Sequence, residues 1–242
     1  MNEQEKHIIS LSFDDGLEKS NLKIAKIYEK FGLSACFNVI ALGHEPDFEA
    51  PDPFHEGYPK GNFELWNELQ ARGHEIMPHG LLHHNLTEKT FVEAQKLILR
   101  CMEIFEGELE HFKSSEAIFN FAYNASTPEL EDWLPEVVKA FRTGGDSLNP
   151  LPHPGQVRLT TTGYGPHNCE DHLDQQIENL FDQPNGWLIY NTHGLDDEGW
   201  GPIRSEYLEA LLSRMNSVEL VRIMPVGKAL ELALNSREKT VD

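Results

Sequence analysis

The sequence has few cysteines and no long apolar run. Its three cysteines, Cys36, Cys101 and Cys169, are odd in number and widely spaced, which excludes a disulfide framework and a CxxC motif. No stretch approaches the roughly 18 apolar residues of a membrane span. The polar start, residues 1–6, lacks the basic and apolar regions of a signal peptide. We therefore expect a cytoplasmic protein without a membrane-spanning segment.

Basic residues are also scarce. The chain has 20 Lys and Arg against 40 Asp and Glu, which gives a formal net charge of -20 at pH 7. A surface of this sign repels phosphate backbones and anionic lipids, so neither nucleic acid nor a membrane is an expected partner. The charge suits a neutral substrate or one whose product is a cationic amine. Solubility alone is the alternative explanation for the acidity.

The order of apolar segments predicts an α/β protein. With 242 residues, 39% of them hydrophobic, the chain is long enough for one packed domain spanning residues 1–242. Alternating or continuous apolar runs predict strands at 7–13, 35–40, 74–77, 117–123, 157–161, 187–192 and 218–224. Helical spacing and capping residues predict helices at 24–31, 62–72, 87–110, 205–215 and 226–234, with another beginning near 126–129.

Strands that alternate with helices are typical of parallel βαβ units. No glycine-rich phosphate loop follows the first strand, which favours a barrel over a dinucleotide-binding fold. The prediction is a distorted (β/α) barrel of about seven parallel strands, with its chemistry at the carboxyl ends of the strands. The loop at 41–61 is too long for a plain connector and is a candidate substrate loop.

Two strand ends carry residues suited to metal binding. Asp14 and Asp15 follow the first strand, where one carboxylate can bind a cation while the other handles protons. His79 and His83 follow the third strand, and two imidazoles four residues apart can chelate one metal. Each pattern alone has an ordinary explanation, because Asp-Asp-Gly is common in turns and paired histidines are common on surfaces.

His193 ends another predicted strand and could donate a proton, since the unperturbed pKa of histidine lies near working pH. An isolated histidine there could equally be structural. The three strand ends together indicate a site in which two histidines and one carboxylate hold a metal and leave a position for water. That pattern is typical of catalytic rather than structural zinc.

These residues resemble the NodB-homology polysaccharide deacetylases, carbohydrate esterase family 4. The segment Ser12-Phe13-Asp14-Asp15-Gly16 resembles the family's first motif, TFDDG. His79 and His83 match the second motif, H(S/T)xxH, with Gly80 in the Ser/Thr position. Ile189, Asn191 and His193 lie where the last motif, LxIxH, would fall. The resemblance runs from residue 7 to about residue 234.

The resemblance implies a role for each residue. Asp14 would be the general base, and Asp15, His79 and His83 would hold the metal. His193 would be the general acid. Zinc is the expected metal, and the same ligands also suit cobalt or nickel. The family fold, a distorted barrel with fewer than eight βα units, agrees with the strand count.

Two motifs depart from the family. The third, RxPY, corresponds best to Asn120-Phe121-Ala122-Tyr123. The backbone N–H of Tyr123 would be the oxyanion donor, a role that needs no side chain. Asn120 replaces the arginine that orients the base, which predicts a raised pKa for Asp14 or another residue, such as Arg142, in that role. The fourth motif, DxxW, has no clear match, although Asp171 and Asp174 lie at a suitable distance before His193.

The expected function is a metal-dependent N-deacetylase that hydrolyses the acetamide of an N-acetylated amino sugar, with metal-bound water as the nucleophile. Trp200 and Asn120 are candidate substrate contacts, although Trp200 could equally be a residue that packs its loop. One alternative is a relative that hydrolyses a non-sugar C–N bond, in a cyclic ureide, an imide or a formamide. Another is an inactive carbohydrate-binding module, against which the retained base Asp14 counts.

Overall fold

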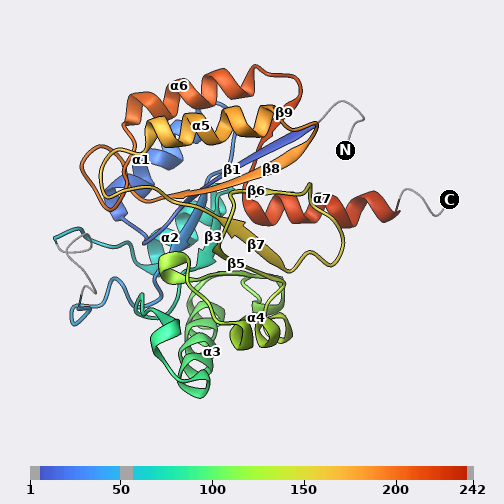
Figure 1. Ribbon diagram of the computed structural model, residues 1–242. Coiled ribbons are helices and arrows are strands. Elements are labelled where there is room, and N and C mark those ends of the chain that lie inside the picture. The colour runs from blue at the N-terminus through green and yellow to red at the C-terminus, as the bar shows by residue number, and fades with distance from the viewer. Residues whose placement is uncertain (1–5, 50–56, 239–242) are drawn as a thin grey trace.

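The computed structural model describes residues 6–49 and 57–238 (Figure 1). The strands are β1 (His7–Phe13), β2 (Cys36–Val39), β3 (Glu75–Pro78), β4 (Ile118–Asn120), β5 (Ala140–Gly144), β6 (Leu148–Asn149), β7 (Arg158–Thr161), β8 (Gly186–Thr192) and β9 (Val221–Ile223). The α-helices are α1 (Glu18–Glu29), α2 (Phe63–Ala71), α3 (Phe91–Glu108), α4 (Pro128–Trp133), α5 (Glu170–Phe181), α6 (Ser205–Asn216) and α7 (Val226–Glu238).

The described strands form two hydrogen-bonded sheets. The larger has six strands, in the order β3-β2-β1-β8-β6, with β9 paired to the first half of β1. The smaller has the order β4-β5-β7. All pairs are parallel except β6 with β8. The predicted α/β class with parallel strands is therefore confirmed, whereas the six-stranded sheet is mixed.

The predicted ring of seven parallel strands is not a continuous ladder in the described residues. β7 reaches β8 through a single bridge, Thr162 with Tyr190. Between β3 and β4 the N–H of Ile118 donates to the sulfur of Met77 at 3.4 Å, in place of a backbone carbonyl. β3 also ends at Pro78, which has no N–H to donate. The two sheets therefore meet at this edge without the regular pairing that a closed barrel requires.

Two elements differ from the predicted order. The expected seven strands include β9, which lies beside β1, and omit β5, which lies in the centre of the smaller sheet. α5 is likewise absent from the prediction, although Leu173, Ile177 and Leu180 form its buried face. The segment expected as a strand at 117–123 ends at Asn120 and continues into a short 3-10 turn, Ala122–Asn124.

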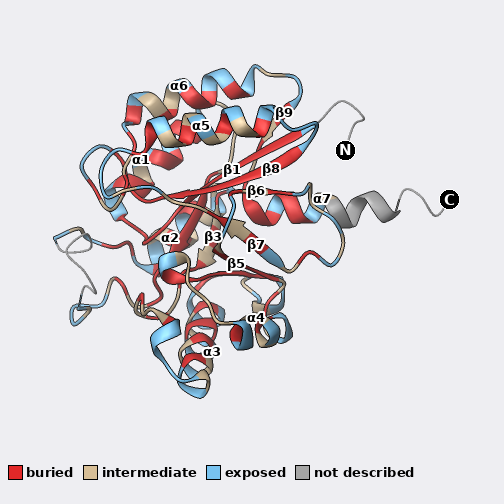
Figure 2. Ribbon diagram, viewed as in Figure 1, coloured by how far each residue is buried: buried red, intermediate tan, exposed pale blue. Residues whose placement is uncertain are grey.

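The alternation of side chains along each strand builds two apolar clusters. The buried residues of the strands are red in Figure 2. On β1, Ile9, Leu11 and Phe13 join the larger cluster, which also contains the buried faces of α1, α3, α5 and α6. Ile8 faces the other way, into a smaller cluster that draws on both sheets and on α7. Ser10 and Ser12 lie on the same face of β1 as Ile8, so this face becomes polar toward the carboxyl end of the strand.

Capping residues set the helix starts near the site. Thr90 and Glu93 form a capping box, so α3 begins at Phe91 rather than at residue 87. Thr127 caps α4, whose first residue is Pro128. Among the described residues, no helix combines the length and the apolar character needed to cross a bilayer.

Candidate active site

Five polar residues predicted from the sequence lie together at the carboxyl ends of three strands. Asp14 and Asp15 follow β1, His79 and His83 follow β3, and His193 follows β8. All five are buried, with relative exposure between 1% and 9%. The three strands are parallel members of the larger sheet, in which β2 lies between β3 and β1, so residues far apart in sequence arrive at one edge.

The carboxylate of Asp15 lies at the centre of this group. Its Oδ1 is 3.5 Å from Nε2 of His79 and 3.3 Å from Nε2 of His83, and its Oδ2 is 3.9 Å from Nε2 of His193. One ligand atom from each of Asp15, His79 and His83 lies within 4.8 Å of the others. Among the described residues, this is the one group of His, Cys, Asp and Glu whose ligand atoms lie close enough to hold a metal ion.

The backbone of this group adopts uncommon conformations. Asp15 has φ 75° and His83 has φ 55°, both in the left-handed region. Such a conformation costs of order 1–3 kcal/mol for a residue with a side chain and is concentrated at functional sites. Between the two histidines, Gly80 has φ 87°, which accounts for a glycine where the family motif has Ser or Thr.

His79 is held in the tautomer that a metal needs. Its Nδ1 lies 3.0 Å from the backbone carbonyl oxygen of Asn120. A carbonyl only accepts hydrogen bonds, so Nδ1 carries the proton and the lone pair of Nε2 faces Asp15. Burial lowers the pKa of His79, against the opposing effect of the two carboxylates. The residues present therefore fit a divalent metal of the zinc type.

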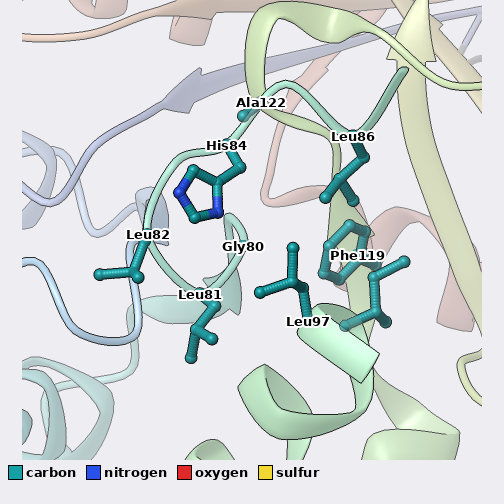
Figure 3. Close-up of a pocket in the computed structure, with 9 residues that line it drawn as sticks. Gly80, Leu81, Leu82, His84, Leu86, Leu97, Phe119 and Ala122 are labelled. Carbon is teal, nitrogen blue, oxygen red and sulfur yellow. The ribbon is translucent and has the colours of Figure 1, made fainter. Parts of the chain in front are cut away.

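The neighbouring His84 is separate from this group. It lines a small apolar pocket with Leu81, Leu86, Leu97 and Phe119, and Figure 3 shows its ring among these side chains. Burial lowers the pKa of His84. The two adjacent histidines therefore have different surroundings, since His83 faces Asp15 and His84 faces an apolar pocket.

Asp14 is bound by an arginine from the smaller sheet. Arg142 on β5 donates from Nη1 to Oδ1 at 2.9 Å and from Nη2 to Oδ2 at 2.5 Å. Burial alone would raise the pKa of Asp14, but the guanidinium, with His79 and His193, lowers it to about 2. Of the two alternatives predicted for Asp14, its pKa is lowered rather than raised, and Arg142 is the arginine that binds its carboxylate.

Asn120, a predicted substrate contact, is only 2% exposed. Its side chain is buried and its Nδ2 donates to Oδ1 of Asn38 at 3.0 Å, and to the carbonyl oxygens of Pro78 and Ile118. Asn38 in turn donates to Oδ1 of Asp14 at 2.7 Å. The side chain of Asn120 is thus connected to the proposed base, Asp14, through Asn38. Sequence reasoning missed Asn38, whose one signal is an amide in an otherwise apolar strand.

His193 contacts Trp200, and no described carboxylate is hydrogen-bonded to its Nδ1. The two rings meet edge to face, 5.5 Å between centroids. Nδ1 of His193 is buried without a hydrogen-bond partner among the described residues. Asp174, one of the two aspartates expected near it, pairs with Arg214 at 2.7 Å instead. The fourth motif of the family therefore has no counterpart at this histidine in the described part of the chain.

Two aromatic residues line the approach to the group. The Tyr123 ring is 47% exposed and packs on His83 with 4.7 Å between centroids, and its backbone has φ 57°. Trp200 is half-buried, and the backbone at Gly165 lies on its ring, where a Cβ would come within 2.5 Å of Cε2. Each ring therefore lies against one histidine of the group.

The long loop at 41–61 reaches the same edge. Its described end contacts the segment after His193, where the hydroxyl of Tyr58 donates to the carbonyl oxygen of Asp197 at 2.9 Å. It also contacts the start of α1, where the N–H of Glu18 donates to Pro59. The middle of the predicted substrate loop, residues 50–56, lies outside the described residues.

Comparison with known proteins agrees with the site. A family model, "Polysaccharide deacetylase", matches residues 1–133, a segment that contains Asp14, Asp15, His79, His83 and Tyr123. The chain belongs to the polysaccharide deacetylase family, which confirms the resemblance drawn from the motifs. A search of curated proteins found no match.

Solved structures show the same fold along nearly the whole chain. A protein assigned as a polysaccharide deacetylase from Mycobacterium smegmatis superposes with a TM-score of 0.72 at 14% identity, covering 98% of this chain and 93% of that one. The peptidoglycan deacetylase PdaC from Bacillus subtilis gives 0.58 at 17% identity, covering 98% and 95%. A family 4 acetyl xylan esterase from Clostridium thermocellum, solved with a cobalt ion, gives 0.59 at 14% identity, covering 93% and 91%.

Proposed function

We propose that this protein is a metal-dependent N-deacetylase that hydrolyses the acetamide of an N-acetylated amino sugar. The observation that carries the proposal is that Asp14 and His193 each lie beside a member of an Asp-His-His ligand set. Oδ2 of Asp14 lies 3.8 Å from Nε2 of His79, and Nε2 of His193 lies 3.9 Å from Oδ2 of Asp15. The proposed base and the proposed acid therefore both lie beside the proposed metal ligands.

Asp15, His79 and His83 would hold the metal, with zinc the expected ion and cobalt or nickel compatible with the same ligands. When bound, the metal supplies Lewis acidity toward the acyl carbonyl and lowers the pKa of water at the site. The tautomer of His79, fixed by Asn120, prepares the ligand set before the ion arrives.

The protein's own residues then divide the proton transfers. Asp14 takes a proton from the attacking water. His193 gives a proton to the departing nitrogen, without which an amide nitrogen is a poor leaving group. The backbone N–H of Tyr123 donates to the oxyanion, and a donor of this kind contributes roughly 3 kcal/mol to the transition state.

The substrate class follows from the surroundings. Trp200, held edge to face against His193, offers a flat surface on which a sugar ring can stack. The negative net charge suits a reaction whose product is a cationic amine. Similar structures include a peptidoglycan deacetylase and an acetyl xylan esterase. We assign this chain the amide because an amide nitrogen needs a proton to depart, and His193 is the proposed donor.

The test combines metal analysis with a substrate panel. Purified protein is loaded with zinc, its zinc content is measured, and release of acetate is followed from oligomers of N-acetylglucosamine and from an O-acetylated xylan. Bound zinc with acetate from the amide supports the proposal. Turnover of cyclic ureides, imides or formamides without acetate release would replace it with a non-sugar C–N hydrolase. Neither bound metal nor turnover would leave a binding module.

A further inference from the structure

We propose that Arg142 is the positioning residue for Asp14 and that, together with Asn38, it makes Oδ2 the oxygen that accepts the proton. This inference rests on the proposed function, in which Asp14 is the base. Arg142 lies outside the segment that matches the family model, and it stands on a different strand from the motif-three position occupied by Asn120.

The strand register explains how an arginine at 142 can serve. β4 and β5 are parallel neighbours, and Asn120 and Arg142 are partners in their ladder. Side chains at partner positions project from the same face of a sheet. The guanidinium therefore starts from the strand next to that of position 120 and on the same face of the sheet. Its two nitrogens reach both oxygens of Asp14, at 2.9 and 2.5 Å.

The count of hydrogen bonds separates the two oxygens of Asp14. Oδ1 accepts from Nη1 of Arg142 at 2.9 Å and from Nδ2 of Asn38 at 2.7 Å, which occupies both of its lone pairs. Oδ2 accepts one short bond from Nη2 of Arg142 and has a long contact of 3.5 Å with Asn191. Oδ2 is also the oxygen 3.8 Å from His79. It therefore has capacity for a proton on the side of the metal ligands.

Asn120 fixes the orientation of Asn38. Its Nδ2 donates to Oδ1 of Asn38 at 3.0 Å, so the amide of Asn38 must turn its own Nδ2 toward Asp14. Ser12 completes the group by accepting from Nη1 of Arg142 at 2.6 Å and from Asn38. The side chain of Asn120 thus binds Asn38, and the positive charge beside Asp14 comes from Arg142 on the adjacent strand β5.

Burial gives this arrangement its rigidity. Arg142 is 0% exposed and Asp14 is 1% exposed, so neither group has water as an alternative partner. A bidentate guanidinium–carboxylate pair fixes orientation as well as charge, which a lysine ammonium cannot do. An unpaired charge at either position would be strongly destabilising. The carboxylate therefore has one orientation in the folded protein.

The experiment compares Arg142→Gln and Arg142→Lys with Arg158→Gln, all loaded with zinc. Arg158 lies on the neighbouring strand β7, is partly exposed and pairs with Glu131 at 2.7 Å, so it is a control for loss of an arginine. For acetate release from N-acetylglucosamine oligomers, we expect kcat to fall about 100-fold in Arg142→Gln and about 10-fold in Arg142→Lys. KM should stay within about twofold. Zinc content should be unchanged, because Arg142 binds the proposed base Asp14 rather than the proposed ligands Asp15, His79 and His83. Arg158→Gln should retain wild-type kcat.

Two further measurements cover a variant that fails to fold. Asn38→Ala removes one donor from Oδ1 without unpairing a charge, and we expect a kcat about 10-fold lower with zinc retained. The free energies of unfolding of Arg142→Gln, Asp14→Asn and the double variant give a coupling that needs no activity. We expect Arg142→Gln to be much less destabilising in the Asp14→Asn background than in the wild type.

The outcomes separate the two proposals. Wild-type kcat in folded Arg142→Gln or Arg142→Lys would overturn the inference, as would a loss of kcat that merely follows loss of zinc. Additive unfolding energies would overturn the pairing itself. A wild-type protein that binds zinc and releases no acetate would refute the proposed function, and the unfolding cycle would still decide whether Arg142 holds Asp14.

Discussion

The Nδ1 atom of His79 lies 3.0 Å from the backbone carbonyl oxygen of Asn120, while Nε2 of the same ring faces Asp15. The carbonyl belongs to the last residue of β4, in the smaller sheet, and the histidine follows β3, in the larger one. The edge where the regular strand pairing is missing is therefore bridged by a side chain that serves the metal site.

Loss of a ligand should remove the metal. His83→Ala deletes one nitrogen from the Asp-His-His set, and we expect zinc affinity to fall at least 100-fold, measured by competition with a chromogenic chelator. His84→Ala is the matched control because the adjacent ring lines an apolar pocket. Equal zinc affinity in the two variants would show that His83 is not a ligand.

Removal of the metal should also lower thermal stability. An ion that binds the folded state alone stabilises it by RT ln(1 + [L]/Kd), about 2.7 kcal/mol at a free concentration of 100 Kd. We expect the chelated wild type to melt several degrees below the zinc-loaded protein, and zinc to have little effect on His83→Ala. A melting temperature that zinc leaves unchanged in the wild type would contradict the metal site.

Loss of the proposed acid should spare metal binding. His193→Ala is expected to lower kcat by about 10²–10⁴-fold toward an amide, because the nitrogen then leaves without a proton. Zinc content should stay at the wild-type level, since His193 is not in the ligand set. An ester of the same acid needs less help in departing, so its hydrolysis should fall less. Equal losses on amide and ester would argue against proton donation by His193.

The loop after His193 gives a prediction about pH. The Asp196 carboxylate accepts hydrogen bonds from the N–H and the hydroxyl of Ser205 at the start of α6, and pairs with Lys23 at 2.9 Å. Burial opposes ionisation, but these partners lower the pKa of Asp196 from 3.8 to about 2. Since the folded-state pKa is the lower one, the stabilisation is complete above about pH 4 and is lost as the pH falls toward 2.

Asp196→Asn should therefore lower the free energy of unfolding at pH 7 by about 1 kcal/mol, the scale of a partly exposed charge at a helix N-terminus. Urea titrations at pH 7 and pH 3 should show the gap between variant and wild type narrowing at the lower pH. Asp197→Asn, at an exposed neighbour, is the control and should change stability by less than about 0.5 kcal/mol. A gap independent of pH would refute a charge effect at Asp196.

Local sequence patterns predict much of this fold. β1 has the predicted bounds, His7–Phe13, because a short apolar run interrupted only by two serines is typical of a buried strand. The start of α4 after Thr127 was predicted from its capping residues, whereas α3 begins after Thr90 rather than at the predicted residue 87. The five clustered site residues were also predictable, since their spacing within motifs places them at strand ends.

The missed features depend on distant contacts. β5 has an arginine at its centre, and a buried arginine is tolerated there because Asp14, 128 residues away in the sequence, neutralises it. No local pattern contains that partner. The gap between β3 and β4 likewise depends on Met77 meeting Ile118. α5 is a different case, because the spacing of Leu173, Ile177 and Leu180 was visible in the sequence.

The most direct test of the central claim is the rate of acetate release from N-acetylglucosamine oligomers by zinc-loaded wild type and by zinc-loaded Asp14→Asn. The proposed function predicts turnover by the wild type, and a rate at least 100-fold lower in a folded variant that retains its zinc. Equal rates in the two proteins, or no acetate from a wild type that holds zinc, would contradict it.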